Sequence, residues 1–214
     1  MWKNERSVGR NIRDERIIKM LCLSGSVMEL DAYKEHVVRH EIGHWYVAKV
    51  LGFDVGEIRI YLKKMAQYES HEAHAHINIH PSLNKKEDIS EYLVRRVSVL
   101  WAGVIFQSVS DKRSVEKILE TDCISDHSKL RELCYILRGI RFSTDTKIEN
   151  ELDQINAIYD ETWEKAKDIY NSNEAEIERL VKKVCSEIKE WNRNYEFNAL
   201  RLQRWLSEDS SVEA

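Results

Sequence analysis

The chain has 214 residues, a third of them charged, with seven glycines, one proline and a formal net charge of −4. This length suits one domain, or one domain with an appendage, and the scarcity of helix breakers among many charges predicts a mainly helical fold. The small negative charge gives no electrostatic basis for binding nucleic acid or an anionic membrane, so neither partner is expected.

Residues 2–23 form a predicted amphipathic helix in which isoleucines and leucines recur among charges. They carry no apolar segment of the kind found in a secretory signal peptide, and no apolar run in the chain is long enough to cross a bilayer. The four cysteines are scattered without a C-x-x-C pair. Reduced thiols in a cytoplasmic protein are therefore expected. Residues 1–30 are interpreted as an N-terminal helical extension that docks onto the core or onto another subunit.

The next predicted helix, over about 32–51, contains the motif H-E-x-x-H, filled by His40, Glu41 and His44. Side chains four residues apart lie on the same helix face, so both imidazoles can reach one metal ion. The carboxylate of Glu41 can then reach a water on that metal and act as its general base. The other interpretation is an ordinary amphipathic helix with surface or core histidines. The helical context, with Gly52 where the helix should end, favours the metal site.

Two strands are predicted next, over 55–62 and 73–80, as a small paired sheet separated by a polar loop. In the second strand the histidines His74, His76 and His80 share one face. They form either a second metal site or a polar strand face near the catalytic cleft. The second interpretation is favoured, because nothing in the sequence fixes a ligand geometry for them.

A long helix over 83–109 follows, and the nearly continuous apolar run at 97–106 indicates that it is central and buried. Within it, Ala102 and Gly103 are small, which would let another helix approach closely.

After a short amphipathic piece at 113–120, Ser125 and Asp126 begin a helix that runs to about Gly139. A carboxylate in the first turn of a helix is favourable as a structural cap, which is one interpretation of Asp126. The other is a third zinc ligand, because three protein ligands with one open position are the pattern of catalytic zinc sites.

The rest of the chain predicts helices over about 147–170, 173–191 and 195–207, each with an apolar stripe. The fold class predicted is mainly α with a small β-sheet. Its main domain covers residues 31–207, followed by a flexible tail at 208–214.

These motifs together resemble the peptidase domain of the FtsH family, zinc proteases usually fused to an ATPase ring. H-E-I-G-H at 40–44 is similar to that family's H-E-A-G-H, W-A-G-V at 101–104 to its L-A-G-R, and C-I-S-D-H at 123–127 to its G-A-x-x-D-L. The helix pair at 152–184 is similar to its A-Y-x-x-A-x-x-I-L-x-x-N run. The resemblance covers roughly residues 32–190 and implies an FtsH-peptidase-like helical zincin domain. The domain is expected to stand alone, because no G-x-x-x-x-G-K-[ST] motif for an ATPase occurs in this sequence.

The resemblance implies a zinc-dependent endopeptidase that hydrolyses peptide bonds in unfolded or flexible protein segments. His40, His44 and Asp126 would hold Zn²⁺, and Glu41 would take a proton from the zinc-bound water. Asp122 is the runner-up for the third ligand, because the G-A of the family's segment is not present here.

The expected partner is a protein or peptide substrate, which could pair with an exposed edge of the sheet. The resemblance also implies a homo-oligomer. Without its own ATPase the protein would cut loose segments, receive substrate from a separate ATPase or make one regulatory cut, and the sequence does not choose among these. One alternative is a catalytically inactive metal-binding interaction or regulatory protein that keeps the peptidase fold. Another is a plain helical interaction protein with an accidental motif.

Overall fold

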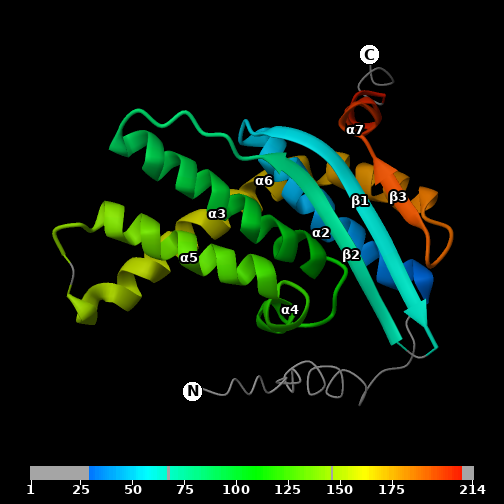
Figure 1. The fold of residues 1–214 in the computed structure, drawn as a ribbon, viewed down its shortest axis with the longest axis horizontal. Coiled ribbons are helices and arrows are strands. Elements are labelled where there is room, and N and C mark those ends of the chain that lie inside the picture. Colours follow the sequence, from blue (N-terminus) through cyan, green and yellow to red (C-terminus); the bar gives the residue numbers. More distant parts are fainter. Residues whose placement is uncertain (1–28, 67, 146, 209–214) are drawn as a thin grey trace, which may run out of the picture.

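The computed structural model describes residues 29–66, 68–145 and 147–208. Within these ranges the chain is mainly helical with one small antiparallel sheet, as predicted (Figure 1). The helices are α2 (Leu30–Val50), α3 (Lys86–Ser108), α4 (Val115–Thr121), α5 (Ile124–Arg141), the 3-10 turn η1 (Ile148–Asn150), α6 (Glu151–Glu187) and α7 (Ala199–Ser207), and the strands are β1 (Asp54–Met65), β2 (Tyr68–Asn78) and β3 (Asn194–Phe197). None of the described helices is both long enough and apolar enough to cross a membrane. Nearly all of the predicted extension at 1–30 and of the predicted tail lies outside the described residues.

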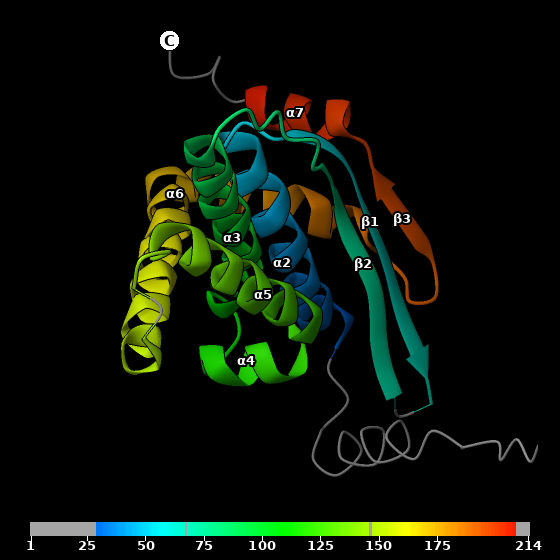
Figure 2. The same ribbon diagram turned by 60° about the vertical axis from the view of Figure 1, so that its left-hand side comes forward.

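The antiparallel pair α2 and α3 forms the centre of the helical layer, with α5 and α6 packed against it (Figure 2). The two central helices approach closely at Gly43, where an added Cβ would lie 2.5 Å from the carbonyl oxygen of Ala102. The apolar run predicted to be buried in α3 is buried, and Trp45 and Phe106 are among the largest fully buried side chains. This close contact holds the middle of α2, which carries the H-E-x-x-H motif, against the middle of α3.

The sheet has the strand order β2-β1-β3 and packs against α2 (Figure 2). Ile58, Ile60 and Leu62 of β1 point inward and are essentially inaccessible to solvent. The prediction of a polar loop over 63–70 was wrong. Most of these residues belong to β1 and β2, which stay paired up to Met65 and Tyr68. Polar side chains do not end a strand in an exposed two-stranded ribbon, where neither face has to be buried.

The C-terminal part differs from the prediction at the start of its last helix. The predicted helix at 195–207 begins later, because Asn194–Phe197 forms β3 against β1, and the side chain of Asn198 then accepts the backbone N–H of Arg201 at 2.9 Å to cap α7. The two helices predicted at 147–170 and 173–191 both lie in α6, and the kink of α6 at Asn173, where the backbone is not helical, falls where one predicted helix gives way to the other.

Candidate metal centre

Three side chains from two helices converge beside the centre of α2. His40 Nε2 lies 3.0 Å from His44 Nε2, because the two residues are one helical turn apart on the same face. The Oδ2 atom of Asp126, in the first turn of α5, lies 3.2 Å from His40 Nε2 and 3.1 Å from His44 Nε2. Ligand atoms around a tetrahedral zinc ion are separated by roughly 3.3–3.5 Å, so these three atoms are spaced much as neighbouring ligands would be.

The runner-up ligand, Asp122, is engaged elsewhere. Its carboxylate accepts hydrogen bonds from Arg113 at 2.6 and 3.0 Å and from Gln107 at 2.7 Å. The structure therefore brings Asp126, and not Asp122, to the two histidines. Within the described ranges, His40, His44 and Asp126 form the group whose ligand atoms could share one ion, all within 4.8 Å of one another.

Helix α3 provides the floor on which the two imidazoles rest. An added Cβ on Gly103 would lie 2.5 Å from His44 Nε2 and 2.6 Å from His40 Cε1, so only glycine leaves room for both rings. Four residues earlier, the carbonyl oxygen of Val99 accepts a hydrogen bond from His44 Nδ1 at 2.7 Å. That bond places the proton on Nδ1 and leaves the Nε2 lone pair facing the cluster, as in many metal-binding histidines.

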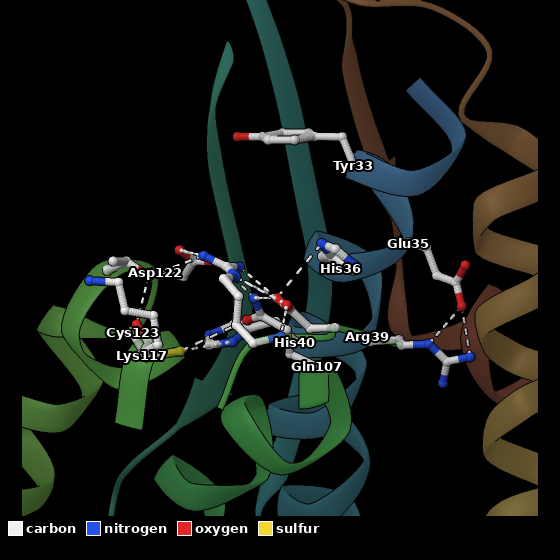
Figure 3. A network of polar contacts seen from close by, with 12 residues as sticks. Tyr33, Glu35, His36, Arg39, His40, Gln107, Lys117, Asp122 and Cys123 are labelled. Carbon is white, nitrogen blue, oxygen red and sulfur yellow. Dashed lines mark hydrogen bonds and ion pairs between the residues drawn. The ribbon is translucent and has the colours of Figure 1, made fainter. Parts of the chain in front are cut away.

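The other histidine, His40, has a cysteine thiol next to Nδ1, the ring nitrogen that points away from the cluster. The thiol of Cys123, the N-cap residue of α5, is buried and lies 3.6 Å from His40 Nδ1 and 3.9 Å from Gln107 Oε1 (Figure 3). Burial raises the pKa of this thiol above its ordinary value, and the nearby Asp122 and Asp126 raise it further. Cys123 is therefore a neutral packing partner of His40 and not a thiolate ligand.

The motif's acid, Glu41, is buried beside the histidines and accepts a hydrogen bond from the backbone N–H of Ala75 in β2. Burial raises the pKa of Glu41 to about 7, a shift that His40 opposes and Asp126 supports. A carboxyl group with this pKa can take up and release a proton near neutral pH.

Electrostatics favours the ionised form of Asp126 in spite of its surroundings. Burial acts to raise the pKa of this carboxyl group, but its close contacts with the imidazoles of His40 and His44, and their charge when they are protonated, hold it well below its ordinary value. Lys129, one turn further along α5, lies 3.8 Å from the other carboxylate oxygen. Asp126 is thus an anion held among cationic or donor groups, a suitable state for binding a metal.

The histidine row on β2 occupies a different place. His74 and His76 are exposed on the outer face of the sheet, where His76 lies near Asn78 and Glu57, and His80 lies beyond the end of the strand. Because these residues are not part of a three-ligand group among the described residues, the structure favours a polar strand face over a second metal site.

Several contributors to the site carried no functional signal in the sequence. The carbonyl of Val99 and the N–H of Ala75 belong to the backbone and cannot be recognised from residue type. Gly103 was predicted only as a place of close helix approach; its contact with the imidazoles depends on the rotation of α3 about its axis, which periodicity does not fix to one side chain.

Comparison with known proteins changes the functional interpretation. No protein-family model matches the chain. A stretch of 97 aligned residues is 29% identical to the phosphopantetheine adenylyltransferase of Malacoplasma penetrans (strain HF-2), and the match covers 42% of this chain and 63% of that protein. The chain therefore spans less than two thirds of the relative that it matches.

This similarity overturns the predicted family and activity. The relative is named for the transfer of an adenylyl group, so the similarity points to a transferase and not to a protease or another hydrolase. The predictions of FtsH-peptidase membership and of a zinc endopeptidase were wrong, and the alternative of an inactive protein with the peptidase fold gains no support. Two imidazoles from one helix and a carboxylate from another are general metal-binding chemistry, so the H-E-x-x-H pattern does not by itself specify the reaction.

Proposed function

We propose that the chain binds one divalent cation through His40, His44 and Asp126, and that zinc is the ion these ligands favour. The convergence of the three ligand atoms within 4.8 Å supports this proposal. Imidazole nitrogens and one carboxylate oxygen form a donor set that suits zinc, and three protein ligands leave one position for an oxygen ligand. The glycine at 103, which keeps the space around the imidazoles free of a side chain, also fits a bound ion.

Glu41 is the residue that we assign to proton transfer at this centre. It neighbours His40 in the chain, is buried, and has a pKa of about 7 because burial disfavours its charged form. At neutral pH it can therefore accept a proton from an oxygen group that the cation polarises.

Metal analysis of the purified full chain tests the proposal. We expect about one zinc per chain after dialysis against metal-free buffer, and we expect His44→Ala and Asp126→Ala to lose most of it. Asp122→Ala is the matched control, since it removes a carboxylate four residues away that contacts Arg113 and not the histidines. Glu41→Gln should also keep the metal. A wild-type chain that retains no divalent ion, or a larger loss in Asp122→Ala than in Asp126→Ala, would contradict the proposed ligand set.

A second candidate function is adenylyl transfer, which the similarity to the Malacoplasma penetrans enzyme favours. In such a reaction a bound cation neutralises charge on phosphate oxygens as the bond to the leaving group breaks. The test is pyrophosphate release from ATP in the presence of phosphopantetheine. We expect release by the metal-loaded chain and at least a tenfold lower rate for His44→Ala, in line with roughly 10²-fold effects of single electrostatic groups. No release by the metal-loaded wild type at saturating substrates would remove this candidate.

A further inference from the structure

Arg96 lies on the face of α3 that borders the metal-ligand cluster. Gly103 follows it by seven residues, which is two helical turns, so the two positions share a face and are about 10 Å apart along the axis. The missing side chain of Gly103 points at both imidazoles, since an added Cβ would lie 2.5 Å from His44 Nε2. The side chain of Arg96 therefore leaves α3 on the side of the cluster, within the reach of a long side chain from it.

The guanidinium group of Arg96 has no hydrogen bond or ion pair with any residue in the described ranges. Other half-buried arginines nearby have hydrogen-bond partners. Arg95, which precedes Arg96 on α3, donates to the carbonyl of Leu51, and Arg138 on α5 donates to Gln154. Arg96 is nevertheless half-buried.

The surroundings of Arg96 are electrostatically linked to the cluster. Burial lowers the pKa of its guanidinium group, and Tyr92 and the carboxylate of Asp126 act in the opposite direction. An arginine stays charged even so. A half-buried cation without a hydrogen bond or an ion pair is costly, which makes an anionic ligand the natural complement for it.

The charge of the loaded site points to the same kind of ligand. The carboxylates of Asp126 and Glu41 can at most balance a divalent ion, so Arg96 and Lys129, which lies 3.8 Å from Asp126 Oδ1, leave an excess of positive charge. The planar fork of arginine donors matches two oxygens of one phosphate group.

We propose that Arg96 binds a phosphate group of the molecule whose oxygen takes the open position of the metal centre. This names the substrate class of the proposed site, a phosphorylated small molecule, and it rests on the proposed metal binding for the position of the second contact. Because Arg96 lies on the face of α3 that borders the ligand cluster, one such molecule can reach both the arginine and the metal.

Calorimetric titration of the zinc-loaded full chain with inorganic phosphate tests the assignment. We expect measurable binding by the wild type and at least roughly tenfold weaker binding by Arg96→Gln, which is the scale of hydrogen bonds to charged groups. Arg96→Lys should retain part of the affinity, because the charge remains and the two-pronged geometry is lost. Arg131→Gln is the matched control: it removes the same charge from an exposed position on the neighbouring helix α5 and should bind phosphate as the wild type does.

Zinc content, measured on the same samples, separates the two proposals. Phosphate binding that depends on Arg96 in a chain that holds no zinc would keep the arginine site and remove the metal centre. A zinc-loaded wild type that does not bind phosphate, or that binds it no better than folded Arg96→Gln, would overturn the arginine site. Equal weakening in Arg131→Gln would overturn it too, because the effect would then be one of overall charge.

Discussion

The hydrogen atom that stands in place of a side chain at Gly103 decides whether two imidazoles fit beside α3. Gly103→Ala would bring a methyl group within 2.5 Å of His44 Nε2 and 2.6 Å of His40 Cε1. We expect both rings to move, and zinc affinity to fall by on the order of tenfold or more, as it does when groups that orient metal ligands are lost. Competition with a chromophoric chelator would measure the affinity.

The control is Gly139→Ala on α5, where an added Cβ meets nothing within 4 Å. There, alanine should stabilise the helix by about 0.5–1 kcal/mol and leave zinc affinity unchanged. If Gly103→Ala binds zinc as tightly as Gly139→Ala does, the rings are not confined by α3.

Asp111 makes a pH-dependent contribution to stability that is independent of the metal. Burial acts to raise the pKa of this carboxyl group, but hydrogen bonds from Arg113 and Gln107 and the charge of Arg113 lower it to about 2. Because the pKa is lower in the folded chain than in the unfolded one, the carboxylate stabilises the fold above about pH 4, and this stabilisation is lost as pH falls towards 2.

The test is Asp111→Asn, studied by urea unfolding at several pH values. We expect it to be less stable than the wild type by at most about 2–3 kcal/mol at pH 6, with the difference shrinking as pH falls from about 4 to 2. A difference that stays constant over this range would mean that the lost stability comes from packing and not from the charge of Asp111.

At the scale of elements, the contact between α2 and α3 is what delivers the histidines to the site. Gly43 is central to it, since an added Cβ would lie 2.5 Å from the carbonyl oxygen of Ala102 and 3.0 Å from the ring of Phe106. The backbone cannot move aside as a flexible side chain can, so Gly43→Ala should force the helices apart. We expect the free energy of unfolding to fall by roughly 2–3 kcal/mol. Urea unfolding of Gly43→Ala beside Gly139→Ala measures the cost. Equal stability of the two variants would show that this contact is loose.

The same scale shows what periodicity could predict and what it could not. The long amphipathic or apolar segments were correctly predicted to be helices, including α2 around His44 and α3 around Gly103. A helix that buries one face has apolar residues at regular intervals in its sequence. The paired strands were also predicted. The short strand β3 was not, because its four residues are too few for alternation to stand out from the helical pattern of α7 behind it.

Long-range convergence lies beyond periodicity as well. The sequence left Asp122 and Asp126 both open as the third ligand, since each is a carboxylate near the start of a predicted helix. What separates them is the position of Arg113, whose guanidinium group holds Asp122 away from the histidines. Which of the two carboxylates reaches the histidines depends on how the turn between α4 and α5 packs, and this packing cannot be predicted from a local sequence pattern. The reaction was even less predictable, because the same metal-binding side chains can serve many substrates.

At the scale of the whole molecule, a cation at this site would be a cross-link between distant parts of the chain. His40 on α2 and Asp126 on α5 are separated by 86 residues, and α3 packs between their helices and holds them in place. An ion that binds the folded chain and not the unfolded one stabilises the fold by an amount that grows with its free concentration.

Zinc should therefore raise the melting temperature of the wild type, and a chelator should lower it again. At a free concentration a hundredfold above the dissociation constant, the gain is about 2.7 kcal/mol, or several degrees for a chain of this size. Asp126→Asn should melt at nearly the same temperature with and without zinc, because the ion has lost its bond to α5. In Asp122→Asn the lost contact with Arg113 lowers the starting temperature, but the zinc-dependent rise should remain. A rise of the same size in Asp126→Asn would mean that the ion holds the molecule together somewhere else.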